Sequence, residues 1–211
     1  MRTSLRRLVF IMTLASVTGL FGLGMVALMR GAPVDAAEVF PQCVAQGEVV
    51  ALYSDYHQYR GTASVVGHDS GRTYMVTAWH VVNPEWGAAE SCIFGVFRVD
   101  KSDTHTDLAI ISVPAEFGVA WEISEEYEDG DEVQLTGHIF GAAPVRTWGH
   151  VSNKAMNWLD SSVHPGMSGG PIAVNGRLIG VTLGYIGPGT LTIFAPACDI
   201  KWIMEGVYDG S

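Results

Sequence analysis

The stretch His164-Pro165-Gly166-Met167-Ser168-Gly169-Gly170-Pro171 decides the fold of this chain. Three glycines lie within two residues of the serine. Because glycine loses more conformational entropy on folding than any other residue, so many glycines in one segment are costly and indicate a site. They let the backbone adopt dihedral angles closed to other residues and let a substrate approach closely. The pattern is typical of a serine nucleophile.

A serine hydroxyl becomes a good nucleophile only when a base takes its proton and a third group orients that base. His80 follows the strand-like run 74–77, and Asp107 opens the apolar run 108–113. Asp103 is a competing acid, but the apolar run directly after Asp107 is expected to bury and orient the carboxylate of Asp107. The candidates therefore occur in the order histidine, acid, serine.

This order separates two classes of serine hydrolase. Residues 166–170 also match the G-x-S-x-G pattern of α/β-hydrolases, in which the histidine follows the serine. All 7 histidines of this chain precede Ser168, so the α/β-hydrolase pattern is excluded.

Three stretches, 77–80, 107–109 and 166–171, resemble the motifs of trypsin-like (chymotrypsin-fold) serine proteases, and most of all the HtrA-type bacterial branch. The resemblance runs from about residue 49 to about residue 204. HtrA-type enzymes usually carry a PDZ domain after the protease domain, and no PDZ domain is expected within these 211 residues.

The resemblance implies a serine endopeptidase that forms a covalent acyl-enzyme through a triad of His80, Asp107 and Ser168. The backbone amides of Gly166 and Ser168 would form the oxyanion hole. One alternative is a catalytically latent binding or scaffolding protein of the same fold, with a collapsed oxyanion loop. A second alternative is an esterase with the same triad.

The same resemblance places the substrate pocket at Ser162, Tyr185 and Ile186. No acid stands at position 162, which disfavours a preference for Lys or Arg and favours small or apolar side chains. No metal or other cofactor is expected to take part in the reaction.

Short β-rich runs separated by turn residues predict an all-β fold. One set lies between residues 49 and 113 and a second between 132 and 194, joined by an acidic loop at 122–132. They fit two packed six-stranded-type β-barrels, a first at about 45–120 and a second at about 130–197. The site is expected in the cleft between the barrels, because the histidine and the acid come from the first and the serine from the second.

Two local signals refine this prediction. Asn175-Gly176, between two apolar runs, predicts a hairpin with a type I′ turn. The apolar-periodic segment 200–207 predicts a short C-terminal helix.

The acidic loop is interpreted as solvated, with a calcium site or repulsion of acidic substrates as alternatives.

The N-terminal 36 residues are predicted to be a signal peptide or a membrane anchor with its linker, followed by the protease domain at 37–211. Leu8 to Met29 carries no charge and no proline and is preceded by three arginines, which predicts export. The length of the segment favours an uncleaved anchor. Cleavage after Ala36 would instead give a secreted or periplasmic protein. In both cases the body is extracytoplasmic, and residues 8–29 are the expected site of membrane association.

Charge and cysteine content constrain the partners and the redox state. Of the 12 Lys and Arg and 22 Asp and Glu of the chain, 8 and 21 lie in residues 37–211. This acidic body excludes nucleic acid as a partner and leaves a protein or peptide substrate, while the oligomeric state stays open. Cys43, Cys92 and Cys198 can form one disulfide at most, and all three pairings remain open.

Overall fold

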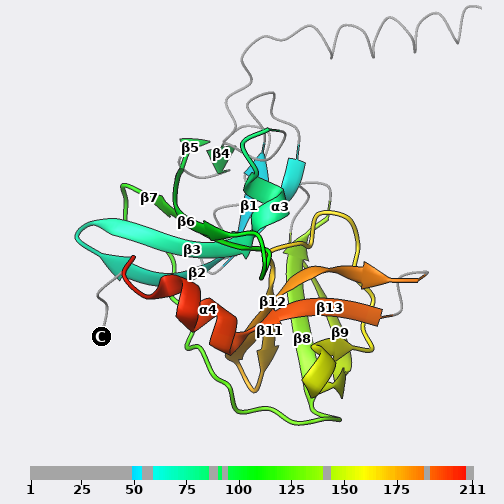
Figure 1. Cartoon of the computed structure of the whole chain (residues 1–211). Coiled ribbons are helices and arrows are strands. Elements are labelled where there is room, and N and C mark those ends of the chain that lie inside the picture. Colours follow the sequence, from blue (N-terminus) through cyan, green and yellow to red (C-terminus); the bar gives the residue numbers. More distant parts are fainter. Residues whose placement is uncertain are drawn as a thin grey trace, which may run out of the picture. The chain divides into compact units, whose positions relative to one another are not determined.

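A computed structural model describes residues 49–53, 59–85, 90–91, 95–139, 144–187 and 191–207 (Figure 1). They form a mostly β structure with a short C-terminal helix, so the predicted all-β, chymotrypsin-like fold class is confirmed. The segment 8–29, its linker, Cys43 and Cys92 lie outside these residues, and export and membrane association stay predictions. No helix within the described ranges is long and apolar enough to cross a membrane.

The first half of the chain forms a seven-stranded sheet in the order β5-β4-β1-β2-β3-β7-β6. All its pairings are antiparallel. The strands are β1 (Val49–Tyr53), β2 (Tyr59–Asp69), β3 (Arg72–Ala78), β4 (Glu90–Ser91), β5 (Gly95–Val96), β6 (Arg98–Asp103) and β7 (Leu108–Val113). A single helical turn, α3 (Trp79–Val82), directly follows β3.

The second half forms a closed six-stranded barrel in the order β10-β13-β12-β11-β8-β9. Its strands are β8 (Glu132–His138), β9 (Pro144–Asn153), β10 (Trp158–Leu159), β11 (Pro171–Val174), β12 (Arg177–Ile186) and β13 (Leu191–Pro196). The predicted hairpin joins β11 to β12, and Asn175 and Gly176 have φ angles of 50° and 78°, as a type I′ turn requires. The predicted C-terminal helix is present as α4 (Ala197–Met204), which lies three residues earlier in the chain than the predicted range 200–207.

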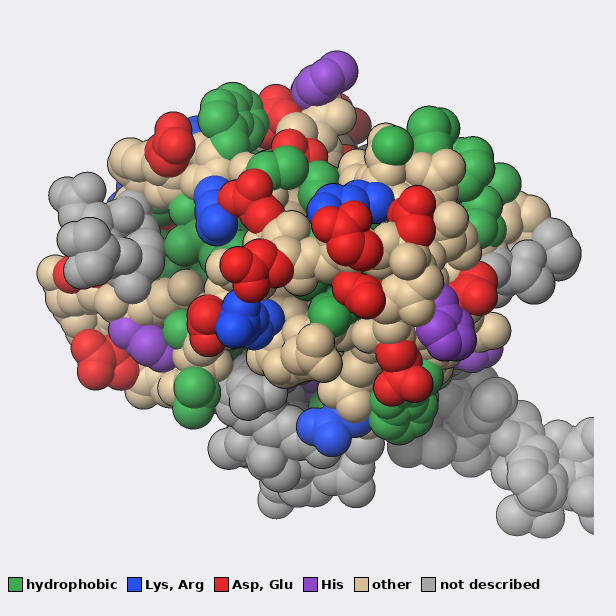
Figure 2. Space-filling model, turned by 90° about the horizontal axis from the view of Figure 1, so that it is seen from below, with side chains coloured by type: hydrophobic (Ala, Val, Ile, Leu, Met, Phe, Trp, Pro, Cys, Tyr) green, Lys and Arg blue, Asp and Glu red, His purple; other side chains and the backbone are tan. Residues whose placement is uncertain are grey.

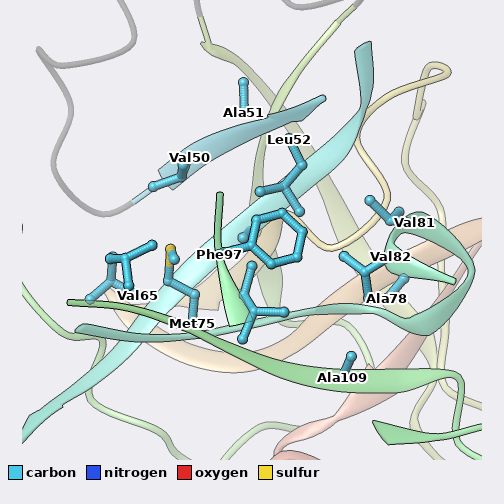
Figure 3. Packing of buried hydrophobic residues seen from close by; sticks show 13 residues of the cluster. Val50, Ala51, Leu52, Val65, Met75, Ala78, Val81, Val82, Phe97 and Ala109 are labelled. Atoms are coloured by element: carbon cyan, nitrogen blue, oxygen red, sulfur yellow. The ribbon is translucent and has the colours of Figure 1, made fainter. Parts of the chain in front are cut away.

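The central strands β3 and β7 are buried on both faces. This explains the nearly continuous apolar sequence of β7, whereas β3 also buries the polar residues Thr73 and Thr77. Met75, Ala109 and Ile111 belong to the core cluster of the first sheet, and Figure 3 shows Met75 and Ala109 with Leu52 and other residues of this cluster. Alternate residues of the same two strands pack instead against the barrel and α4. This second cluster comprises Val66, Tyr74, Val76, Leu108, Ile110, Leu178, Val181, Ala195, Ile200 and Ile203. The two halves therefore share a hydrophobic interface.

The acidic segment that joins the two halves forms ion pairs with basic side chains at the surface. Glu125 pairs with Lys201 at 2.7 Å, Glu126 with Arg177 at 3.0 Å, and Glu128 with Lys154 at 3.3 Å. Figure 2 shows acidic and basic side chains next to one another on the face seen from below. Among the described residues, no group of three or more side chains is arranged to hold a metal ion.

Candidate active site

The contact between His80 and Asp107 follows from the pairing of two neighbouring strands. β3 and β7 are antiparallel, and their last register pair joins Ala78 to Leu108. The residues just after β3 and just before β7 are therefore adjacent, and the Trp79 amide donates to the Asp107 carbonyl oxygen at 2.8 Å. A separation of 27 residues in sequence becomes a direct contact in space.

Both carboxylate oxygens of Asp107 bind His80. The Oδ2 atom lies 2.6 Å from the ring Nδ1, and Oδ1 accepts the backbone amide of His80 at 2.9 Å. Asp107 has φ = 55°, in the left-handed region where Asp is one of the better tolerated non-glycine residues. The two contacts fix the carboxylate relative to both the ring and the backbone of His80.

The side chain of Asp107 is less buried than the apolar run after it suggests. Its exposed fraction is 32%, and that of His80 is 37%, whereas Leu108 is completely buried. The reason is that Asp107 lies in the turn before β7 rather than in the strand. The His80–Asp107 pair is therefore partly open to solvent.

The competing acid, Asp103, has a different role. Its Oδ2 accepts the hydroxyl of Thr106 at 2.7 Å and the amide of Thr106 at 2.8 Å. These hydrogen bonds lower the pKa of the Asp103 carboxyl, with the hydroxyl contributing most. Asp103 thus stabilises its own turn, while Asp107 binds the histidine.

The predicted nucleophile lies in a loop that requires its glycines. Gly166 and Gly169 have φ angles of 98° and 81°. A Cβ atom on Gly169 would lie 2.1 Å from the carbonyl oxygen of Thr62 and 2.3 Å from Oγ1 of Thr77. The glycine-rich stretch therefore satisfies both a dihedral requirement and a close approach to the first sheet.

Backbone hydrogen bonds hold this loop, residues 164–170, from within and from the barrel. The amide of Met167 donates to His164 at 3.0 Å, and the amide of Gly169 donates to Thr182 at 2.7 Å. Met167 itself is completely buried in the barrel core. The Ser168 amide has no acceptor among the described residues, so it is available to an anionic oxygen.

The Ser168 hydroxyl points to a backbone carbonyl in this structure. It donates to Leu183 at 3.2 Å, its single hydrogen bond within the described part of the chain, and none joins it to His80. The carbonyl oxygen of Ser168 accepts the amide of Thr62 at 2.8 Å. Ser168 is thus tied to the half of the molecule that carries His80 and Asp107.

The residues predicted to line the substrate pocket lie near the end of β12 and in the segment before the loop. Tyr185 and Ile186 are 49% and 46% exposed, and Ser162 is also exposed. Tyr185 pairs with Thr192 of β13, whose hydroxyl donates to the carbonyl oxygen of Ser161 at 2.8 Å. Thr192 therefore contacts both segments that are predicted to line the pocket, the end of β12 and the segment before the loop.

Thr62 and Leu183 carry no sequence signal that identifies them as parts of this site. Each lies inside a β-rich run and contacts Ser168 only because distant segments meet. The one pattern nearby is the close spacing of Thr62 and Ser64, whose hydroxyls donate to Gly166 and Gly169 respectively. Two polar residues so close together in a buried strand could have indicated that this strand faces a loop.

Comparison of the sequence with known protein families identifies a peptidase domain. The sequence profile of the trypsin-like peptidase domain matches residues 61–181. No curated protein matches the chain in sequence.

Three solved structures share the fold. A serine endoprotease from Yersinia pestis is 24% identical with a TM-score of 0.64, and the match covers 84% of this chain and 68% of that one. The HtrA-type protease AlgW, solved with a tripeptide, is 19% identical with a TM-score of 0.65 and coverages of 83% and 63%. An inactive serine-to-alanine mutant of an M. tuberculosis protein is 21% identical with a TM-score of 0.61 and coverages of 84% and 95%.

Proposed function

The chain belongs to the trypsin-like peptidase domain family, which makes it a serine endopeptidase, and we propose that it cleaves peptide bonds through a triad of His80, Asp107 and Ser168. The observation that carries this proposal is the pair of contacts from the Asp107 carboxylate to the ring Nδ1 and the amide of His80. A carboxylate bound in this way selects the tautomer that a general base needs.

In the proposed reaction, Nδ1–H of His80 donates to Asp107, which leaves the lone pair of Nε2 available as a base. Ser168 Oγ attacks the carbonyl carbon of the scissile peptide, and Nε2 takes the hydroxyl proton. The same proton passes to the leaving amine as the peptide C–N bond breaks, which gives an acyl-enzyme ester. Water then attacks the ester, again with His80 as the base, and releases the acid and the free serine.

The negative oxygen of each tetrahedral intermediate would bind the backbone amides of Gly166 and Ser168. Fixed donors of this kind stabilise the charge as it develops, and one of them is worth about 10²–10³ in rate. The open Ser168 amide supports this assignment.

The Ser168 hydroxyl must rotate from Leu183 toward His80 before it reacts. Its present hydrogen bond is 3.2 Å long. A bond of this kind contributes about 1 kcal/mol in net terms, which is a small part of a catalytic barrier. Catalytic hydrogen bonds are often long or absent without substrate and tighten when it binds.

A fluorophosphonate probe tests the proposal, because it phosphonylates only an activated serine. We expect one equivalent of probe to label the full chain at Ser168. Labelling should be lost in both Ser168→Ala and His80→Ala, each checked for folding by circular dichroism. A folded wild-type protein that does not react would contradict the proposal and favour the latent binding protein.

We also propose that the enzyme prefers small or apolar side chains before the scissile bond. Ser162 is uncharged, and the exposed faces of Tyr185 and Ile186 offer apolar contact. Cleavage-site profiling with a peptide library should show this preference, and Ser162→Asp should shift it toward Lys and Arg. Ser152→Asp adds the same charge to an exposed position of β9 and should leave the profile unchanged. Cuts mainly after basic residues in the wild type would overturn this assignment.

A further inference from the structure

We propose that Thr62 is a positioning residue that holds the peptide between the two oxyanion-hole amides in its reactive orientation. The inference rests on the proposed function, because it concerns the loop that would bind the negative oxygen. Thr62 lies in β2, far from the loop in sequence, and is completely buried.

Thr62 binds the loop with its backbone and its side chain at once. Its amide donates to the carbonyl oxygen of Ser168 at 2.8 Å, and its Oγ1 donates to the carbonyl oxygen of Gly166, also at 2.8 Å. Its own carbonyl oxygen accepts the hydroxyl of Thr77 at 2.7 Å. One residue of the first sheet therefore fixes two consecutive turns of the loop.

A second hydrogen bond, from another part of the chain, sets the direction of the Thr62 hydroxyl group. Its Oγ1 accepts the backbone amide of His138, at the end of β8, at 3.0 Å. A hydroxyl has one proton to donate, and here that proton goes to Gly166. A β-branched side chain is also stiff about χ1, so the oxygen stays between the two backbone groups.

The peptide group that Thr62 binds determines the geometry of the proposed oxyanion hole. The peptide from Gly166 to Met167 separates the Gly166 amide from the Ser168 amide. Its carbonyl group is held by Thr62 and its N–H group by His164, at 2.8 and 3.0 Å. Glycine at 166 gives this peptide wide rotational freedom, so contacts from outside the loop must define its orientation.

Misplacement of such a donor has a large effect on rate. A shift of about 1 Å in a reacting geometry can cost about 10²-fold, and loss of one oxyanion donor costs about 10²–10³-fold. Removing the Thr62 hydroxyl should give the peptide more freedom without deleting either donor. We therefore expect a decrease of about 10–100-fold in the chemical step.

Thr73 provides a matched control. It is also a completely buried threonine of the first sheet, and its Oγ1 donates to the carbonyl oxygen of Ala115 at 2.7 Å and accepts the amide of Phe117 at 3.1 Å. The donor and acceptor contacts to these two groups match those of Thr62, but both groups belong to the segment after β7, and Oγ1 of Thr73 also lies 3.2 Å from Nδ1 of His68 in β2. Thr73→Val should lower thermal stability by a similar amount and leave the chemistry at Ser168 unchanged.

The experiment measures fluorophosphonate inactivation of the full chain over a range of probe concentrations, which separates kinact from KI. Thr62→Val should lower kinact by about 10-fold or more and leave KI unchanged, since the loop geometry and not the substrate surface is altered. Thr62→Ser keeps the hydroxyl and should stay within about threefold of the wild type, the difference reflecting its freer χ1. Should Thr62→Val not fold, Thr62→Ala removes the same hydroxyl and provides a second test.

The outcomes separate this inference from the proposed function. A hydroxyl-free variant of Thr62 with the kinact of the wild type would overturn the positioning role alone. An equal loss of kinact in Thr73→Val would overturn it too, because the effect would then follow from stability. A folded wild-type protein that takes up no probe would overturn the proposed function and this inference with it.

Discussion

Asp107→Asn is expected to lower kcat/KM by about 10⁴-fold while the protein remains folded. An asparagine side chain has nearly the same shape, but its NH₂ group cannot accept a proton from Nδ1. Oδ2 now accepts that proton at 2.6 Å, and its replacement by a donor would turn the imidazole to the tautomer with a protonated Nε2. A histidine in that tautomer cannot take the proton of Ser168.

Asp103→Asn is the control, since Asp103 is the other acid in the same turn. Its Oδ2 accepts two hydrogen bonds from Thr106 and no hydrogen bond joins it to His80 among the described residues. We expect its activity to stay within about threefold of the wild type, as for a surface residue that acts only on local stability. The measurement is hydrolysis of a peptide substrate found by profiling, with kcat and KM determined separately. Comparable activity losses in the two variants would refute the assignment of Asp107.

Gly169→Ala is expected to prevent folding or to lower the free energy of unfolding by more than about 3 kcal/mol. The residue has φ = 81°, and an added Cβ would lie 2.1 Å from one backbone oxygen and 3.0 Å from the amide nitrogen of Ala78. These atoms belong to β2 and β3, which are central strands of the first sheet and cannot move aside without disturbing the pairing with their neighbours. The methyl group would have to push the two halves apart.

Gly176→Ala isolates the dihedral part of this cost. Gly176 has φ = 78°, close to that of Gly169, but an added Cβ would meet nothing within 4 Å. Left-handed strain alone costs about 1–2 kcal/mol. Urea unfolding followed by tryptophan fluorescence compares the two variants. Equal destabilisation would mean that the close approach of the loop to the first sheet is not rigid.

The contact of His80 with Asp107 could be predicted from the order of the motifs and their resemblance to trypsin-like proteases, but not from local sequence. The strands β3 and β7 are separated in the chain by β4, β5 and β6, so the sequence does not indicate that these two strands are neighbours in the sheet. The Asn175-Gly176 hairpin is a different case, because a two-residue turn carries its own dihedral requirement. There the information lies within the turn itself.

The contacts of Ser168 could not be predicted in the same way. The Thr62 hydroxyl and Gly166 are 104 residues apart, and the rotamer of Ser168 depends on where a carbonyl group of β12 happens to lie. Periodicity and motifs report which face of a strand is buried, but they do not report which backbone atom on another strand is opposite. The degree of exposure of Asp107 has the same origin, because it depends on the turn before β7 and not on the strand itself.

The tie between Thr62 and Ser168 also bears on the time at which proteolysis can begin. Synthesis delivers the half with His80 and Asp107 first, and at about 5–20 residues per second Ser168 follows several seconds later. The loop that carries it then needs β2 as its support, through the amide of Thr62. A chain that lacks the first half would therefore lack the strand that supports the loop of Ser168.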